Sequence, residues 1–283
     1  MSPSDAGGIA AAPRLGDDLY VAPPRSDRWI VLGAQIAIVA VAVALWELAV
    51  VKGWITEFFF GKPSEVLRYL VERTKDGYLV THTWVTLYEE LLGFIAGTVV
   101  GTAAGLSLWW SPFLSRVLEP FAVVLNATPK IVIAPILVVW FGIGLMSKVM
   151  IAVLICAIVA WLGAFDGVRN ADRDQMDMVR AVGGKRRHVF WKIVVPSSLP
   201  WILTTMRINI GLALIGVITG EFLSSTAGLG YLVDSTAKLY QMSHTIAALV
   251  LIAAIAGAQF YFVNWLERRL LPWAEDHELD FIT

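Results

Sequence analysis

Long apolar runs alternate with short polar connections along the chain. Six runs have the length and hydrophobicity of membrane-spanning helices: residues 29–51, 91–110, 121–143, 149–165, 201–222 and 245–266. A helix needs about 20 mostly apolar residues to cross the hydrocarbon core of a bilayer. Two prolines interrupt the third run, and the fourth is short. The pattern predicts an all-α, polytopic membrane protein with six transmembrane helices.

The composition supports this fold class and divides the chain into three parts. Of 283 residues, 57% are hydrophobic and 16% are charged, whereas soluble domains are about 45–50% apolar and about 25% charged. Residues 1–28 are polar and rich in Pro, Gly and Asp, which predicts a disordered cytoplasmic tail. We expect a membrane domain over residues 29–273 and a short acidic cytoplasmic tail over 274–283.

The stretch "AVGGKRRHVFWKIVVPSSLP", residues 181–200, is the most basic part of the chain. It belongs to a connection over residues 166–200 that holds seven Lys and Arg residues. A basic residue at mid-membrane costs roughly 2.5–3.5 kcal/mol, and cytoplasmic loops are enriched in Lys and Arg. We therefore expect this loop and both termini in the cytoplasm, in a multi-pass protein of the cell membrane.

The first part of this loop predicts a short surface helix. Residues Asp172–Val182 can form a helix whose apolar side includes Met176 and Val179 and extends to Val182. Gly183–Gly184 would end it, because glycine accepts the left-handed turn that a helix stop requires.

The second part predicts another helical piece, over His188–Val195, that stops at Pro196, with Pro200 opening the next span. The resulting helix-turn-helix, basic on one side and apolar on the other, would fit a groove on a cytoplasmic partner. The alternative is an ordinary positively charged loop that only fixes the topology, and the residues alone do not separate the two.

Glycines recur every four residues in two of the predicted spans, as Gly93, Gly97, Gly101 and Gly105 and as Gly216 and Gly220. On a helix this spacing forms a groove that lets another backbone approach closely. The groove serves packing within one chain or, alternatively, lines a dimer seam.

Polar side chains inside spans are costly and usually face a bundle interior or a water-filled path. The third and fifth spans are therefore the candidates for a solute pathway. Arg207 could instead extend to the cytoplasmic interface, and Glu221 could be solvated at the outer end. The candidate pathway residues are Asn126, Thr128, Lys130, Thr205, Arg207, Asn209 and Glu221.

Reactive clusters are not evident in the sequence. The single cysteine, Cys156, lies in an apolar run and is interpreted as a small buried side chain. The four histidines are far apart and match no metal-binding spacing, and no Walker A motif or G-x-S-x-G elbow is present. We expect no catalytic activity and no cofactor, and the net charge of −1 gives no reason to expect nucleic-acid binding.

The basic loop resembles the EAA motif of ATP-binding cassette importer permeases, written E-A-A-x3-G-x9-I-x-L-P. Asp177, Met178 and Val179 occupy its first three positions, Gly183 follows at the right distance, and Ile193–Pro196 ends it. The glycine, isoleucine and proline match, whereas Asp replaces Glu, Met-Val replaces Ala-Ala and Val replaces Leu.

Other segments resemble the nitrate/sulfonate/taurine type of these permeases in the same order along the chain. They are "LWELAVVKGW", "GKPSEVLRYL", "TLYEELLGFIAGTVVGTAAGLSLWWS", "ATPKIVIAPILVVWFGIGLMSKV", "GEFLSSTAGLGYLV" and "LERRLLPW". The resemblance covers roughly residues 45–273. It implies a permease subunit, embedded in membrane lipid, that itself hydrolyses no ATP.

The resemblance also implies partners. Two permease copies would form the pore as a homodimer, two cytoplasmic ATP-binding subunits would dock on the loop, and an extracytoplasmic solute-binding protein would meet Ser224–Leu232 and residues 52–85. The implied coupling residues are Asp177, Met178, Val179, Arg180, Gly183, Lys185, Arg186, His188, Ile193 and Pro196.

The implied solute is a small anionic compound such as a sulfonate, taurine or nitrate. The alternatives are a permease of the same superfamily for an aromatic acid or a pyrimidine precursor, and a passive channel.

Overall fold

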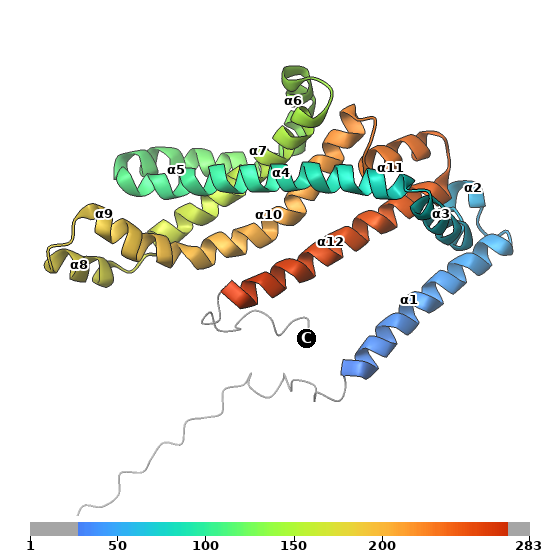
Figure 1. The fold of residues 1–283 in the computed structure, drawn as a ribbon, viewed down its shortest axis with the longest axis horizontal. Helices are drawn as coiled ribbons and strands as arrows, with labels where there is room; N and C mark the ends of the chain where they lie inside the picture. Colours follow the sequence, from blue (N-terminus) through green and yellow to red (C-terminus); the bar gives the residue numbers. More distant parts are fainter. Residues whose placement is uncertain (1–27, 271–283) are drawn as a thin grey trace, which may run out of the picture. The chain divides into compact units, whose positions relative to one another are not determined.

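The computed structural model describes residues 28–270, which form helices joined by short connections and contain no strand. The tails predicted over residues 1–28 and 274–283 lie outside the described residues, apart from Arg28. The chain divides into two compact units, Met1–Leu45 with His277–Thr283 and Trp46–Asp276. The helices are α1 (Arg28–Val51), α2 (Glu57–Phe60), α3 (Pro63–Lys75), α4 (Tyr78–Ser107), α5 (Pro112–Ala127), α6 (Ala134–Phe141), α7 (Leu145–Arg169), α8 (Arg173–Ala181), α9 (Arg186–Val189), α10 (Val195–Ser224), α11 (Leu229–Lys238) and α12 (Met242–Leu270) (Figure 1).

The membrane spans confirm the predicted fold class. Within the described part of the chain, five helical stretches are long and apolar enough to cross a bilayer, and a bent helix pair makes a sixth when it is counted as one span. The five stretches are Trp29–Val51, Tyr78–Trp110, Leu145–Arg169, Arg186–Ser224 and Met242–Trp265.

The third predicted span, residues 121–143, is not continuous. The helical segments Pro112–Ala127 and Lys130–Phe141 meet at an angle of 87°. Between them Thr128 is extended, with φ −72° and ψ 133°. Pro129 explains the break, because proline lacks a backbone N–H and disfavours the helical conformation in the residue before it.

The second span begins earlier than predicted, at Tyr78 instead of residue 91. Asp76 prepares this start, since its Oδ1 accepts the backbone N–H of Tyr78 at 3.0 Å. That hydrogen bond, assisted by Arg73, lowers the pKa of the Asp76 carboxyl. The prediction started too late because Glu89 and Glu90 end the uncharged run at residue 91, whereas both side chains are buried in the structure.

The core of the larger unit is the packing of α4 and α10 against α7. A Cβ atom at Gly97 would lie 2.7 Å from Cβ of Cys156, and one at Gly101 would lie 2.8 Å from Cβ of Ala160. Gly93 and Gly105 approach α7 in the same register, and Gly216 and Gly220 bring α10 against Ala152 and Lys148 of the same helix. Both glycine patterns therefore serve packing within one chain, and the alternative that they line a dimer seam is wrong because α7 already fills the grooves.

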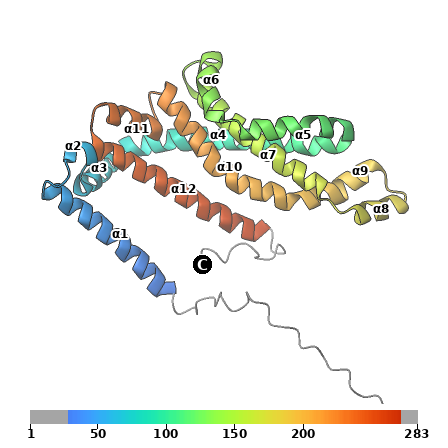
Figure 2. The same ribbon diagram turned by 180° about the vertical axis from the view of Figure 1, so that it is seen from behind.

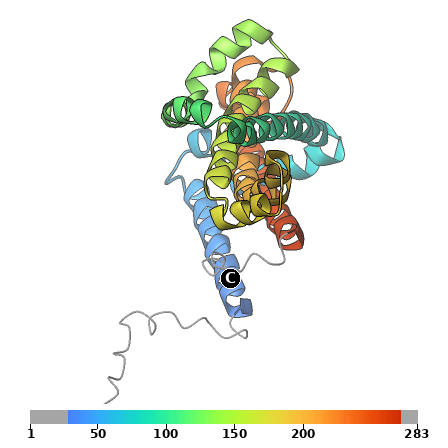
Figure 3. The same ribbon diagram turned by 90° about the vertical axis from the view of Figure 1, so that its left-hand side faces the viewer.

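Two further apolar clusters mark opposite ends of the long helices. One joins α3, α4, α11 and α12 around Tyr69, Leu79 and Leu232. The other joins the loop before α8 to the start of α10 around Met176 and Phe190. Figures 1 and 2 show α3 and α11 at one end and α8 and α9 at the other, and Figure 3 views the molecule from the α8–α9 end.

Candidate functional site

The basic loop contains the predicted surface helix. Asp172 caps α8, because its Oδ1 accepts the backbone N–H groups of Asp174 at 2.8 Å and Gln175 at 3.4 Å. Gly183 adopts φ +83° just after the helix, and the Gly184 N–H donates to the Val179 carbonyl at 2.9 Å. The predicted helix and its glycine stop are confirmed.

The second helical piece does not end at Pro196, as the sequence predicted. α9 continues through a π-helical stretch, Phe190–Val194, directly into α10. Pro196 is the second residue of α10 and directly follows the π-helical stretch. The helix also accommodates Pro200 in its interior. The loop is therefore joined to the fifth span by one unbroken helical path.

The α8 helix presents two different sides. Met176 is buried against Val189, Phe190 and Val194. Met178 is 71% exposed and Val182 is 82% exposed. Val182, which was expected on the apolar side of this helix, lies just after its last residue. Two large apolar side chains at the tip of the loop are left in contact with solvent.

Polar contacts hold the base of the loop. Arg186 donates to the Trp109 carbonyl at 2.7 Å and lies over the ring of Trp110. The Lys185 N–H donates to Nδ1 of His188 at 3.1 Å. On α8, Arg180 donates to Oδ1 of Asp177 at 2.8 Å. Two coupling candidates lie at the start of the fifth span, where Ile193 is half-buried and Pro196 is exposed.

The pathway candidates of the third span gather at the break between α5 and α6. Lys130 Nζ donates to the Asn126 carbonyl at 3.0 Å and to its Oδ1 at 3.3 Å. Thr128 donates to the Val124 carbonyl at 2.8 Å. Asn126 and Thr128 are exposed and Lys130 is half-buried, so polar groups are accessible at the break.

The pathway candidates of the fifth span are less exposed than those of the third span. Asn209 is fully buried and donates to Thr98 Oγ1 at 3.2 Å and to the Cys156 carbonyl at 3.1 Å. It thereby ties α10 to α4 and α7. Thr205 donates to backbone carbonyls of its own helix, and Arg207 is half-buried. Cys156 is buried, which confirms its interpretation.

Glu221 is buried, so the alternative that it is solvated at the outer end is wrong. Its carboxyl is 1% exposed and accepts hydrogen bonds from the Thr86 hydroxyl at 2.7 Å and the Gly230 N–H at 2.5 Å. Thr86 also accepts the Leu229 N–H at 2.8 Å, and His82 Nδ1 accepts the Gly228 N–H at 2.9 Å. These bonds hold the α10–α11 connection against α4.

A buried ion pair extends this network to α7. Lys148 pairs with Glu89, and both side chains are almost completely shielded from solvent. Lys148 also donates to Ser225 Oγ at 3.0 Å. This set was not predicted, although His82, Thr86 and Glu89 recur at helical spacing, because residues 82–89 precede the apolar run that begins at residue 91.

The family model for the binding-protein-dependent transport system inner membrane component matches residues 93–273, from the middle of α4 past the end of α12. The chain belongs to this family. It is thus a multi-pass permease of the inner membrane, and the matched range includes the α8–α9 loop, Lys148 and Glu221.

Named relatives agree with this assignment. The permease is 32% identical over 236 residues to an ABC transporter permease protein of Haemophilus influenzae, covering 83% of this chain and 96% of that one. It is 26% identical to an aliphatic sulfonates transport permease protein of Bacillus subtilis, over 84% and 87% of the two chains. It is 31% identical to the formylaminopyrimidine transport permease protein of Halalkalibacterium halodurans, over 76% and 86%. The resemblance to ABC permeases of the sulfonate type is confirmed.

A solved structure supports the fold. The permease superimposes on a chain of the inward-facing methionine ABC transporter MetNI with a TM-score of 0.58 and 18% identity, covering 68% of this chain and 93% of that one.

Proposed function

We propose that this permease forms the solute pathway of an ATP-driven importer and couples to a separate ATP-binding subunit through α8 and α9. The observation that carries the proposal is the two-sided α8 helix. Its tip exposes Met178 and Val182, and large exposed apolar groups favour burial in a partner's groove. Asp177, Arg180 and Lys185 beside them supply charges for specificity.

The connection between α8 and α10 gives the loop a mechanical role. Met176 anchors α8 to Val189 and Val194, and these residues lead without a break into the fifth span. A displacement of α8 by the ATP-binding subunit would therefore shift α10. The far end of α10 carries Glu221, which holds the α10–α11 connection, so the same shift would reach the opposite side of the membrane.

The proposed assembly contains two copies of the permease as a homodimer, two ATP-binding subunits and an extracytoplasmic solute-binding protein. Both termini and the α8–α9 loop would lie in the cytoplasm, in agreement with the Lys and Arg residues of that loop. The binding protein would meet Ser224–Leu232 and residues 52–85, at the opposite end of the long helices.

The proposed solute is a small anion of the sulfonate type. The sulfonate relative supports this class, and Lys130 offers a positive charge at the break between α5 and α6. A pyrimidine precursor is the second candidate, because the formylaminopyrimidine relative is 31% identical. A solute-binding protein that carries its ligand would decide between them.

The test is purification of the tagged permease from its own host in a mild detergent, followed by mass spectrometry of the co-eluting proteins. An ATP-binding subunit at one copy per permease, together with a solute-binding protein, is the expected result. A stable oligomer of the permease alone, which conducts ions in a bilayer, would overturn the proposal in favour of a passive channel.

A further inference from the structure

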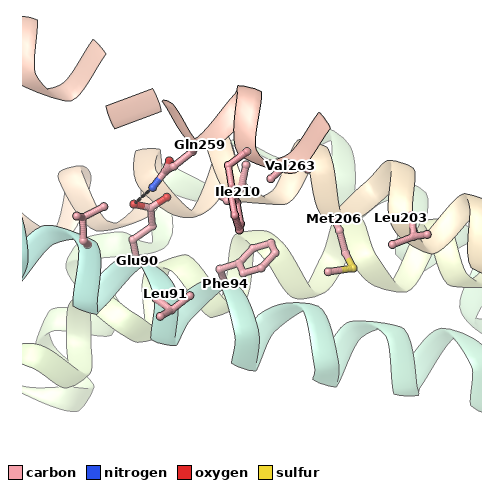
Figure 4. A pocket seen from close by; sticks show the side chains of 10 residues that line it. Glu90, Leu91, Phe94, Leu203, Met206, Ile210, Gln259 and Val263 are labelled. Atoms are coloured by element: carbon pink, nitrogen blue, oxygen red, sulfur yellow. Dashed lines mark hydrogen bonds between the residues drawn. The ribbon is translucent and has the colours of Figure 1, made fainter. Parts of the chain in front are cut away.

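A cavity of about 300 Å³ lies between α4, α10 and α12. Figure 4 shows Phe94 and Ile210 beside it, with Met206 and Leu203 toward one end and Glu90 and Gln259 together at the other. Its wall is almost entirely hydrocarbon and aromatic carbon, apart from this polar end.

Two acceptor atoms at the polar end lack partners. Glu90 is 2% exposed, and its Oε2 accepts the Gln259 amide N–H at 2.8 Å. Among the described residues, Oε1 of Glu90 and Oε1 of Gln259 have no hydrogen-bond partner, and both atoms are shielded from solvent. A buried polar atom without a partner costs roughly 1–3 kcal/mol, and more when it is charged. The cavity end therefore favours a group that donates hydrogen bonds.

We propose that this cavity binds an amphipathic molecule with an apolar body and an amine or hydroxyl head. The head would donate to Glu90 Oε1 and Gln259 Oε1, and the body would lie against Phe94, Met206 and Ile210. A primary amine fits best, since it supplies both the donors and a charge opposite to a carboxylate.

The two acceptor oxygens make this cavity unsuitable for an anionic solute, so the proposed ligand differs from the proposed transported solute. A sulfonate or carboxylate head would place its oxygens against two acceptor oxygens, which is repulsive. Water alone would satisfy the polar end but gain nothing from the apolar wall. The helices that form the cavity belong to membrane spans, so the ligand would enter from the lipid phase.

The probe is octylamine carrying a terminal diazirine, photolysed with the intact purified complex in nanodiscs, with labelled peptides mapped by mass spectrometry. Saturable labelling of the facing parts of α4, α10 and α12 is expected. Unlabelled octylamine and octanol should compete and octanoate should not. Glu90→Gln should weaken labelling about tenfold, because a charge-assisted hydrogen bond becomes a neutral one.

Two further variants keep the test decisive. Ile210→Phe, which fills the cavity and leaves Glu90 in place, should abolish the labelling. Tyr261→Phe is the matched control, since Tyr261 is 73% exposed on α12 and does not line the cavity. Equal competition by octanoate, or labelling that persists in Ile210→Phe, would overturn the proposal. The absence of any labelling of the cavity wall would also overturn it, because a second copy of the permease that closes the cavity would exclude the probe.

Discussion

Lys148 and Glu89 form an ion pair inside the membrane domain, with both side chains almost completely shielded from solvent. Removing one partner of a buried pair typically costs about 3–5 kcal/mol, because the other charge is left uncompensated. An exposed pair contributes only about 0–1 kcal/mol. A lysine in a buried ion pair should therefore contribute much more to the free energy of unfolding than a lysine in an exposed ion pair.

We predict that Lys148→Met destabilises the purified permease by about 3–5 kcal/mol. The matched control is Lys238→Met, which removes the exposed partner of Asp234 and should change stability by about 1 kcal/mol or less. Denaturant unfolding followed by tryptophan fluorescence measures both. Equal losses in the two variants would show that the Lys148–Glu89 pair stabilises the fold no more than an exposed pair does.

At the break between α5 and α6, Lys130 should contribute to the affinity for an anionic solute. Lys130→Met is expected to raise the KM of ATP-driven uptake by up to about fivefold, the effect of about 1 kcal/mol. Arg116→Met, an exposed cation on α5 outside the candidate pathway, serves as the control. Unchanged affinity in the double variant Lys130→Met, Arg207→Met would contradict an electrostatic role in the pathway.

At the scale of the element, the turn after α8 depends on one glycine. Gly183 adopts φ +83°, and no atom of the described residues lies within 4 Å of the position of a Cβ, so within this part of the chain a substitution meets backbone strain and no steric clash. Left-handed backbone costs a residue other than glycine roughly 1–2 kcal/mol, and a β-branched side chain adds further restriction.

We predict that Gly183→Val uncouples the importer: uptake falls while ATP hydrolysis by the assembled complex continues. The matched control is Gly211→Val, on the exposed side of α10, where a Cβ also meets nothing within 4 Å and the backbone is helical. Transport and ATPase rates measured in the same proteoliposomes test this. Unchanged uptake in Gly183→Val would refute a coupling role for the turn.

The elements also show how far the sequence could predict this structure. Apolar length identified the spans, and Gly183 identified the end of α8, because both signals are local. The start of α4 was missed because Glu89 becomes compatible with the membrane only through Lys148, 59 residues further along the chain. The helix through Pro196 was missed because a π-helical stretch at Phe190–Val194 precedes it, and no local residue pattern indicated that stretch.

At the level of the whole molecule, local sequence signals likewise located only part of the candidate site. The EAA-like residues could be located from their resemblance to a family motif, and in the structure they lie along α8, the turn after it, α9, the π-helical stretch and the start of α10. The buried network around Glu221 could not be predicted, since His82, Thr86, Lys148 and Gly230 meet only after α4, α7 and α10 pack together. The central functional claim is that the exposed tip of α8 is where the permease meets its ATP-binding subunit.

The most direct test of that claim is photo-crosslinking from the tip of α8. Benzoylphenylalanine would replace Met178 in the permease, in membranes of its own host, with Leu67 on α3 replaced in the control. We expect an adduct between the permease and an ATP-binding subunit from position 178 and none from position 67. No such adduct from position 178, or the same adduct from both positions, would contradict it.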